Sequence, residues 1–431
     1  QLQRRRDGAT SVFDRGNVNF GGAPTPADRR GIWVTGSVKN LDIDQWLALF
    51  KGGSAGGVQF DLGGVDLKLG GAELFGRHYN EFSLAGSAQG GNWQVTVNGR
   101  ELAGDVSWRP QGRGRVTARM KTLTIPARKG PRVLQPADSA PLELPALDIV
   151  AEQFQYGEIV LGKLELNAQP DGRDWKIERL RIVNPDGSIQ ADGVWQAWLT
   201  QPRTMVNIKL DVHDIGKLLQ RFGYPEGVRG GTGKLEGPLS WAGHPGELDY
   251  ATLSGNFVVE AAKGQFLKLD PGAGKLLGIL NLQSLPRRLS LDFRDIFSDG
   301  LAFDEIVGAV KVNRGVANTE NLRIQGPAVR ILMSGDVDLN AETQKLRVKV
   351  FPSLSDSLSV AGALVAGPIA GIAAFVAQKL LKDPLNQMAS FEYSVTGTWA
   401  DPQVVKLDSS QAAAADKADK AEKADKGGKA K

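Results

Sequence analysis

The stretch VNIKLD, residues 206–211, alternates apolar and polar side chains with a period of two. Val206, Ile208 and Leu210 fall on one side of an extended chain, and the polar residues between them fall on the other. The same alternation recurs in VDLKL (residues 65–69) and LRVKVF (residues 346–351), and Gly- and Asp-rich turns separate such segments. We therefore predict a mainly β protein whose antiparallel sheet has one apolar face and one wet face.

Internal repeats accompany this alternation. VDL at residue 65 precedes Trp93 by 28 residues, and LDI at residue 147 precedes Trp175 by the same 28. LRIVNPDGSIQADG (residues 180–193) matches LRIQGPAVRILMSG (residues 322–335), and GKLEGPLSWAGHP (233–245) resembles YSVTGTWADP (393–402). A strand followed by a helical pattern occurs at residues 36–50 and again at 210–223. These matches predict a duplicated β architecture with a few short amphipathic helices.

Composition argues against several classes of function. The net charge of +4 on 431 residues is small, and no basic stripe is interleaved with aromatic residues, so we expect no nucleic-acid partner. Cysteine is absent, and the three histidines lie far apart in the sequence, so we expect no metal site. No nucleophile motif is present, and most carboxylates alternate with apolar residues on predicted strands. We therefore predict that the protein has no catalytic residues and no cofactors, and that it is not an enzyme.

An uncharged segment, SLSVAGALVAGPIAGIAAFVAQ (residues 357–378), has the length of a membrane-spanning helix. Gly367-Pro368 interrupts it, and FEYSVTGTW returns to the strand pattern afterwards. We therefore predict a membrane-facing helix at about residues 358–382, broken at Gly367, rather than a simple span. Its proposed membrane-contacting residues are Ile369, Ile372, Phe375, Val376 and Leu380. The alternative is that this helix only caps the core of the sheet.

Residues 255–407 carry a distinctive series of motifs. It includes PGAGKLLGILNLQSLPRRLSLDFRDIFSDG (residues 271–300) and YSVTGTWADP (residues 393–402). This series resembles the C-terminal region of YhdP-type members of the AsmA-like family, and VTGSVKNLDIDQWLALF (residues 34–50) resembles the same proteins more loosely. The resemblance implies an elongated, curved antiparallel sheet, a repeating β-groove shaped like a taco. It also implies a periplasmic protein of a Gram-negative bacterium, held in the inner membrane by an N-terminal anchor that is absent from this chain.

The function implied by the resemblance is phospholipid transport between the inner and outer membranes, which supports the outer-membrane barrier. Acyl chains would lie in an apolar groove, and the C-terminal helix would face the outer membrane. The expected groove residues are Val206, Ile208, Leu210, Leu322, Ile324, Leu346, Val348 and Val350. The expected parts are repeated groove units in residues 1–254, the AsmA-like region in 255–407 and a disordered Ala/Lys/Asp-rich tail in 408–431.

Three alternatives stay open at the level of sequence. The one-sided apolar strands also suit a packed β-sandwich. A non-catalytic assembly scaffold would bind outer-membrane protein partners through exposed strand edges. A polysaccharide-active enzyme would need two carboxylates facing each other across a cleft, and no convincing pair stands out.

Overall fold

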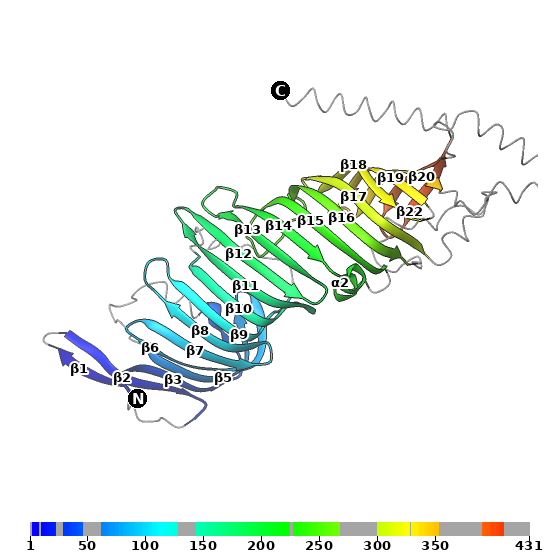
Figure 1. Ribbon diagram of the computed structural model, residues 1–431. Coiled ribbons are helices and arrows are strands. Elements are labelled where there is room, and N and C mark those ends of the chain that lie inside the picture. The colour runs from blue at the N-terminus through cyan, green and yellow to red at the C-terminus, as the bar shows by residue number, and fades with distance from the viewer. Residues whose placement is uncertain are drawn as a thin grey trace, which may run out of the picture. The chain divides into compact units, whose positions relative to one another are not determined.

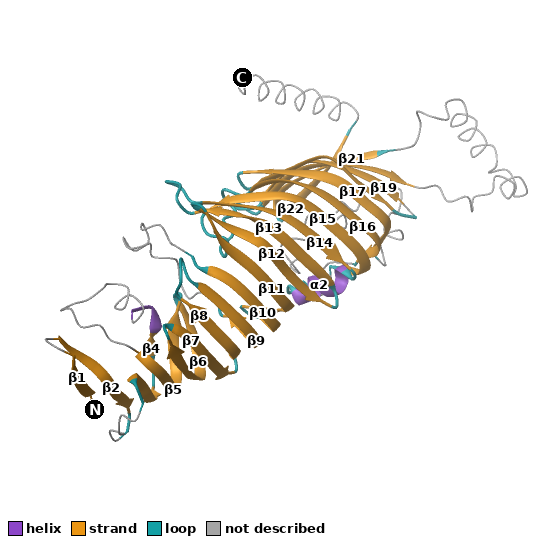
Figure 2. Ribbon diagram, turned by 60° about the vertical axis from the view of Figure 1, so that its left-hand side comes forward, coloured by secondary structure: helices purple, strands orange, loops and turns teal. Residues whose placement is uncertain are grey.

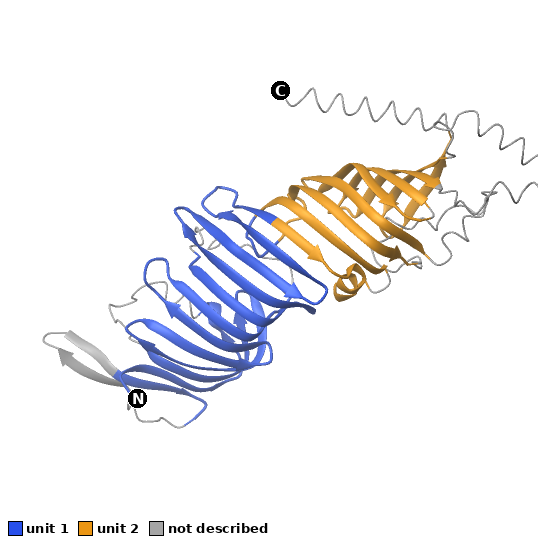
Figure 3. Ribbon diagram, in the orientation of Figure 1, with its two compact units in different colours: residues 1–207, 243–247 blue, residues 208–242, 248–431 orange. Residues whose placement is uncertain are grey.

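The chain is mainly β, as its alternation predicts (Figure 1). The computed structural model describes residues 2–7, 10–22, 29–45, 62–127, 144–224, 227–267, 300–327, 329–352 and 390–408. The chain divides into two compact units (Figure 3). Unit 1 comprises residues 1–207 and 243–247, and unit 2 comprises residues 208–242 and 248–431.

Unit 1 is built from one curved sheet (Figure 2). Its strands are β1 (Leu2–Asp7), β2 (Thr10–Phe20), β3 (Gly31–Val38), β4 (Leu41–Asp42), β5 (Leu62–Leu74), β6 (Arg77–Gln89), β7 (Asn92–Gly99), β8 (Leu102–Arg109), β9 (Arg115–Ile125), β10 (Ala146–Tyr156), β11 (Ile159–Asp171), β12 (Asp174–Asn184) and β13 (Gly187–Gln196). Strand β14 (Arg203–Val212) has residues in both units.

Most neighbouring strands of unit 1 pair antiparallel through short turns. The turn between β6 and β7 is Gly90-Gly91, and both residues have positive φ, 56° and 79°, which glycine adopts without steric strain. Four pairings are parallel instead: β2 with β3, β3 with β5, β4 with β5, and β9 with β10. The prediction of a curved antiparallel sheet is thus confirmed in its main part, and the parallel steps are an addition that the alternation pattern does not reveal.

The sequence repeat corresponds to a repeat of strands. β5 to β9 are five successive antiparallel strands, and β10 starts the next set beside β9. Trp93 at the start of β7 is in register with Trp108 on β8, and Trp175 at the start of β12 is in register with Trp195 on β13. The predicted duplication around Trp93 and Trp175 is therefore confirmed within unit 1.

Unit 2 contains the remaining strands of the sheet and one short helix. Its elements are α2 (Ile215–Arg221), β15 (Val228–Ala242), β16 (Ser254–Phe266), β17 (Leu301–Asn313), β18 (Val316–Gln325), β19 (Val329–Asp338), β20 (Thr343–Pro352), β21 (Phe391–Thr398) and β22 (Pro402–Leu407). From β15 to β22 each strand pairs antiparallel with the next. The matched segments at residues 180–193 and 322–335 form the corresponding hairpins β12–β13 and β18–β19.

Helix α2 follows β14 where the strand-then-helix pattern predicts a helix. The Asp214 side chain caps it by accepting a hydrogen bond from the Lys217 backbone N–H at 3.0 Å. Ile215 and Leu219, one helical turn apart, pack against the buried core of unit 2. The helix is therefore positioned by its N-cap and by this apolar stripe.

Some predictions lie outside the described residues. They are the broken helix at about residues 358–382, with its membrane-contacting residues Ile369, Ile372, Phe375, Val376 and Leu380, and nearly all of the tail at 408–431. Among the helical segments that the structure does describe, none has the length and apolar content needed to cross a membrane.

The N-cap of α2 gives a first testable prediction. Asp214→Ala removes the acceptor for the Lys217 N–H and should lower the free energy of unfolding by about 0.5–2 kcal/mol. Asp214→Asn keeps a capping oxygen and should stay within a few tenths of a kcal/mol of the wild type. Urea unfolding followed by far-UV circular dichroism measures the difference. Equal midpoints for the alanine variant and the wild type would contradict the assigned role of the cap.

Candidate functional site

An unbroken row of small and apolar residues crosses the sheet of unit 1. Each member is in register with the next on the neighbouring strand, so all of them share one face, which we call the apolar face of unit 1. The row contains Val18, Val34, Val65, Gly86, Val95, Val106, Ala118, Ile149, Leu166, Leu180 and Ala191. The apolar surface therefore continues from β2 to β13 without a charged residue.

Much of this row stays within reach of solvent. Val95, Ile149 and Leu180 are only half-buried, and Val18 is 39% exposed. Within the described residues, unit 1 has a single sheet and neither a second sheet nor a long helix over this face. A packed sandwich would bury such side chains against a partner layer. The half-open row instead resembles the lining of an apolar groove.

Charged residues occupy the opposite face of unit 1. Asp105 accepts a hydrogen bond from the Thr96 hydroxyl at 2.7 Å, and Arg119 is in register with Asp105. The Arg119 guanidinium also donates to the Asp148 carboxylate at 2.9 Å. This hydrogen bond, more than the charge of Arg119 and that of Arg115, holds the pKa of Asp148 below its ordinary value. The polar face thus pairs Arg119 with Asp148, and the apolar row contains no charged residue.

Five predicted groove residues come together in unit 2. Ile324 is in register with Ile331, and Ile331 with Val350. Leu322 is in register with Met333, and Met333 with Val348. Leu346 is in register with Val395 on the next strand. Leu322, Ile324, Leu346, Val348 and Val350 therefore share one face, which we call the apolar face of unit 2.

This face is more closed than that of unit 1. Ile324 is 2% exposed, Val348 1% and Val350 7%, whereas Leu322 is half-buried. Burial also raises the pKa of the neighbouring Tyr393 phenol. In the chain by itself, these side chains already form a packed core. A ligand on this face would therefore have to separate side chains that are in contact.

The three predicted groove residues of β14 follow the same alternation. Val206 is buried, and Ile208 and Leu210 are half-buried. A Cβ added to Gly193 would lie 2.8 Å from the Val206 Cγ1 methyl, and Gly193 is in register with Ile177 on the apolar face of unit 1. Val206 therefore belongs to this face.

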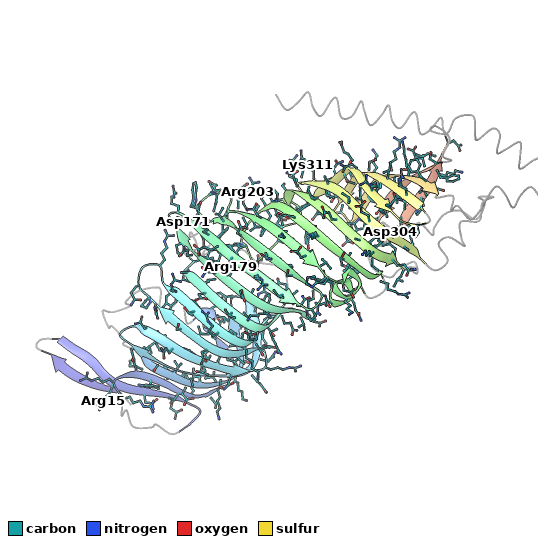
Figure 4. The ribbon with its side chains drawn as sticks, viewed as in Figure 1. Arg15, Asp171, Arg179, Arg203, Asp304 and Lys311 are labelled. Atoms are coloured by element: carbon teal, nitrogen blue, oxygen red, sulfur yellow. The ribbon has the colours of Figure 1, made fainter. Side chains whose placement is uncertain are left out.

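The other face of unit 2 is polar. Arg347, on the face opposite Val348, forms an ion pair with Glu392, whose second oxygen lies 3.6 Å from the Lys349 amine. Exposed residues such as Lys311 on β17, like Arg179 on β12 in unit 1, belong to the polar faces of their sheets (Figure 4). Each unit therefore separates charge from hydrocarbon across the thickness of one sheet.

Sequence reasoning missed a feature of the strand ends. Every tryptophan in the described residues lies within three residues of a strand end. In unit 1 these are Trp33, Trp93, Trp108, Trp175, Trp195 and Trp198, at the edge formed by the β6–β7, β8–β9 and β11–β12 turns. In unit 2 they are Trp241 and Trp399, at the edge formed by the β17–β18, β19–β20 and β21–β22 turns. We call each of these the tryptophan edge of its unit. A tryptophan just before turn residues, as in SWRP and TWAD, is the sequence signal that could have predicted these edges.

The described residues hold no group of three or more histidine and acidic side chains placed to bind a metal ion. The two-faced sheets are the candidate functional site.

A family model described as YhdP protein matches residues 1–404 of the chain. The chain belongs to the YhdP family. The resemblance seen in the sequence motifs is thereby confirmed. The chain is also 25% identical over 371 residues to the intermembrane phospholipid transporter YhdP of Escherichia coli (strain K12). The alignment covers 84% of this chain and 29% of that relative, so the chain spans less than a third of the relative's length. No solved structure matches the chain.

The two faces of unit 2 predict opposite outcomes for the same charge. Val348→Asp places a carboxylate among buried hydrocarbon and should lower the free energy of unfolding by more than about 3 kcal/mol. Leu332→Asp, on the neighbouring strand, places it on the polar face in register with Lys349 and should change stability by less than about 1 kcal/mol. Chemical unfolding of both variants tests the assignment. Similar losses for the two would show that the faces are not distinct.

Acid stability provides a further prediction. The pKa of Asp148 is lower in the folded chain than in an unfolded one, so its contribution is present above the unfolded value of about 3.9. That contribution is lost as the pH falls through the lowered folded pKa. Asp148→Asn and Arg119→Gln should each make unfolding stability less steeply dependent on pH between about pH 5 and pH 2. An unchanged dependence in both variants would contradict the Arg119–Asp148 pair.

Proposed function

We propose that this chain is a segment of a periplasmic conduit that carries phospholipids between the inner and outer membranes. The acyl chains lie against the apolar faces, and the polar faces point to water. The observation that carries this proposal is the half-open apolar row from β2 to β13. The E. coli relative's name, intermembrane phospholipid transporter, supports it, and the periplasm is the compartment between those two membranes.

The apolar face supplies the type of interaction that an acyl chain requires. A phospholipid has roughly 30 CH₂ groups, and each contributes about 0.8 kcal/mol when it leaves water. A bilayer offers the same lipid nearly the same burial. Because the two environments are alike, exchange between them is close to neutral in free energy. A lipid can therefore enter and leave such a face, which a tight polar site would prevent.

The residues assigned to this role are those of the apolar faces. In unit 1 the half-buried row members and Val206 line the path, and in unit 2 Leu322, Ile324, Leu346, Val348 and Val350 do so. Ile208 and Leu210 on β14 belong to the same set. No step of bond formation is involved, so the function is transport without catalysis.

The ends of the conduit complete the proposal. An N-terminal anchor would hold one end of the conduit at the inner membrane; the aligned region covers 29% of the E. coli relative. The segment at about residues 358–382 would contact the outer membrane through its apolar residues. With these two contacts, the polar faces would remain in the aqueous periplasm along the whole path.

A matched pair of variants tests the proposed function. Val95→Asp puts a carboxylate in the middle of the apolar row of unit 1, whereas Gln94→Asp puts it on the opposite face one residue earlier. The wild-type chain, purified from cells in mild detergent and extracted, should carry phospholipid detectable by mass spectrometry. Val95→Asp should reduce the amount at least several-fold, because a carboxylate in hydrocarbon is unfavourable. Gln94→Asp should carry as much as the wild type.

Two results would contradict the proposal. One is wild-type chain with no more phospholipid than an unrelated β protein purified in the same way. The other is an equal loss from both aspartate variants, since that outcome would show no preference for the apolar face. Circular dichroism spectra of the three proteins control for loss of the fold.

A further inference from the structure

The two edges of unit 2 differ in chemistry. Trp399 and Gln344 lie at its tryptophan edge, and both belong to the apolar face, since Gln344 follows the alternation of Leu346 and is in register with Gly397. At the opposite edge the same face ends in hydrocarbon alone. The residues there are Val228, Phe266, Leu301, Phe303 and Val329, and we call this the hydrocarbon edge of unit 2. The Phe266 and Phe303 rings lie 5.0 Å apart.

The tryptophan edge also holds unpaired polar atoms. The Trp399 indole N–H is buried, and it has no hydrogen-bond partner among the described residues. The Gln344 side-chain oxygen is likewise buried and unpaired, although its amide nitrogen donates to the Thr398 carbonyl at 3.4 Å. Leaving such a group unpaired costs about 1–3 kcal/mol. A donor and an acceptor therefore lie together at one end of an otherwise apolar face.

The feature recurs at the tryptophan edge of unit 1. The Trp195 indole N–H is buried and has no partner within the described part of the chain. Trp195 ends β13 on the apolar face, where it is in register with Trp175. By contrast, the Trp175 N–H donates to the Pro145 carbonyl at 2.9 Å, so pairing of these indoles is possible where the backbone provides an acceptor.

We propose that a glycerophospholipid binds unit 2 in one orientation, with its glycerol esters and phosphate at the tryptophan edge and its acyl chains running along the strands to the hydrocarbon edge. This inference rests on the proposed function and adds the direction in which the lipid lies. The Trp399 N–H donates to an ester or phosphate oxygen, and the Gln344 oxygen accepts from an N–H or O–H of the headgroup. The Trp399 N–H and the Gln344 oxygen are shielded from water in the chain by itself. The two side chains therefore separate when the lipid binds.

The length of the strands suits this orientation. Six residue steps separate Gln344 from Val350 on β20, which is about 20 Å at ~3.4 Å per residue. The hydrocarbon of one leaflet is about 15 Å thick, half of a ~30 Å bilayer core. An acyl chain that starts at the tryptophan edge therefore ends near the hydrocarbon edge. The opposite orientation would place esters and phosphate against Leu301 and Val329, where the face offers hydrocarbon only.

Tryptophan is also the side chain expected at such a boundary. Its ring is apolar and its N–H is a donor, so it is enriched where hydrocarbon meets polar groups, as at the two surfaces of a membrane. Among the described residues of unit 2, no tryptophan lies at the hydrocarbon edge. This agrees with a lipid whose polar part lies at one side only.

Photo-crosslinking measures the orientation directly. The full chain is loaded from vesicles that contain phosphatidylethanolamine with a diazirine either on the headgroup or at the end of one acyl chain. After illumination, adducts are mapped by peptide mass spectrometry. The headgroup probe should label residues 339–346 and 395–403, and the acyl probe should label residues 300–306 and 348–352. Identical or reversed patterns would overturn the orientation, whereas no labelling by either probe would overturn the proposed function itself.

Two variants test the polar atoms. Trp399→Phe keeps a ring and deletes the N–H, and headgroup-probe labelling at the tryptophan edge should fall by about two- to tenfold, which is the worth of one hydrogen bond. Trp198→Phe makes the same change in unit 1, where the indole N–H donates to the Asp174 carboxylate at 2.6 Å; it is the matched control and should keep the wild-type labelling of unit 2. Wild-type labelling by Trp399→Phe would mean that these atoms hold water only, and would overturn the proposed contact.

Discussion

A sheet one layer thick with an apolar face must have something cover that face, because hydrocarbon exposed to water is unfavourable by about 25 cal/mol per Å². The rest of this chain depends on how that requirement is met. In unit 2 the side chains contact one another closely enough to bury Ile324 and Val348. In unit 1 the row through Val95 and Leu180 remains half-open. The two units differ in how deeply their apolar side chains are buried, rather than in the reactive groups that they carry.

The separation of faces relies on register. A slip of one residue would exchange the two faces of a strand, so Val348 would join Arg347 on the polar side. Charge pairs on the polar faces, such as Arg119 with Asp148 and Arg347 with Glu392, oppose such a slip because it would bury them in hydrocarbon. Irregular registers occur at several steps, for example between Ile177 and Leu180, and yet the next apolar pair is again in line. The bulges therefore change the strand register locally without moving apolar residues onto the polar face.

The sequence predicted the faces well because alternation is a local property. VDLKL and LRVKVF each indicate which side chains point to hydrocarbon, and the repeat around Trp93 and Trp175 indicates equivalent strands. It did not predict the parallel step from β9 to β10, since pairing after a long connection depends on where the chain returns to the sheet. It also missed the indoles of Trp195 and Trp399, because the unpaired state of a buried N–H depends on neighbours distant in sequence. The deep burial of Val348 was not predicted for the same reason, because it also depends on neighbours distant in sequence.

The parallel step has a consequence for how such a protein can change its length. Five antiparallel strands are an odd number, so β9 ends at the edge opposite to the one where β5 began. Strand β10 starts beside the start of β9 and runs parallel to it, so β10 begins at the same edge as β5. The next set of strands therefore runs in the same directions as the first set. A gene duplication of one set would therefore add about 24 Å of sheet, at ~4.8 Å per strand, with the same side chains on the same edge. The length of the sheet can thus evolve in steps of one set, without exchanging the residues of its two faces.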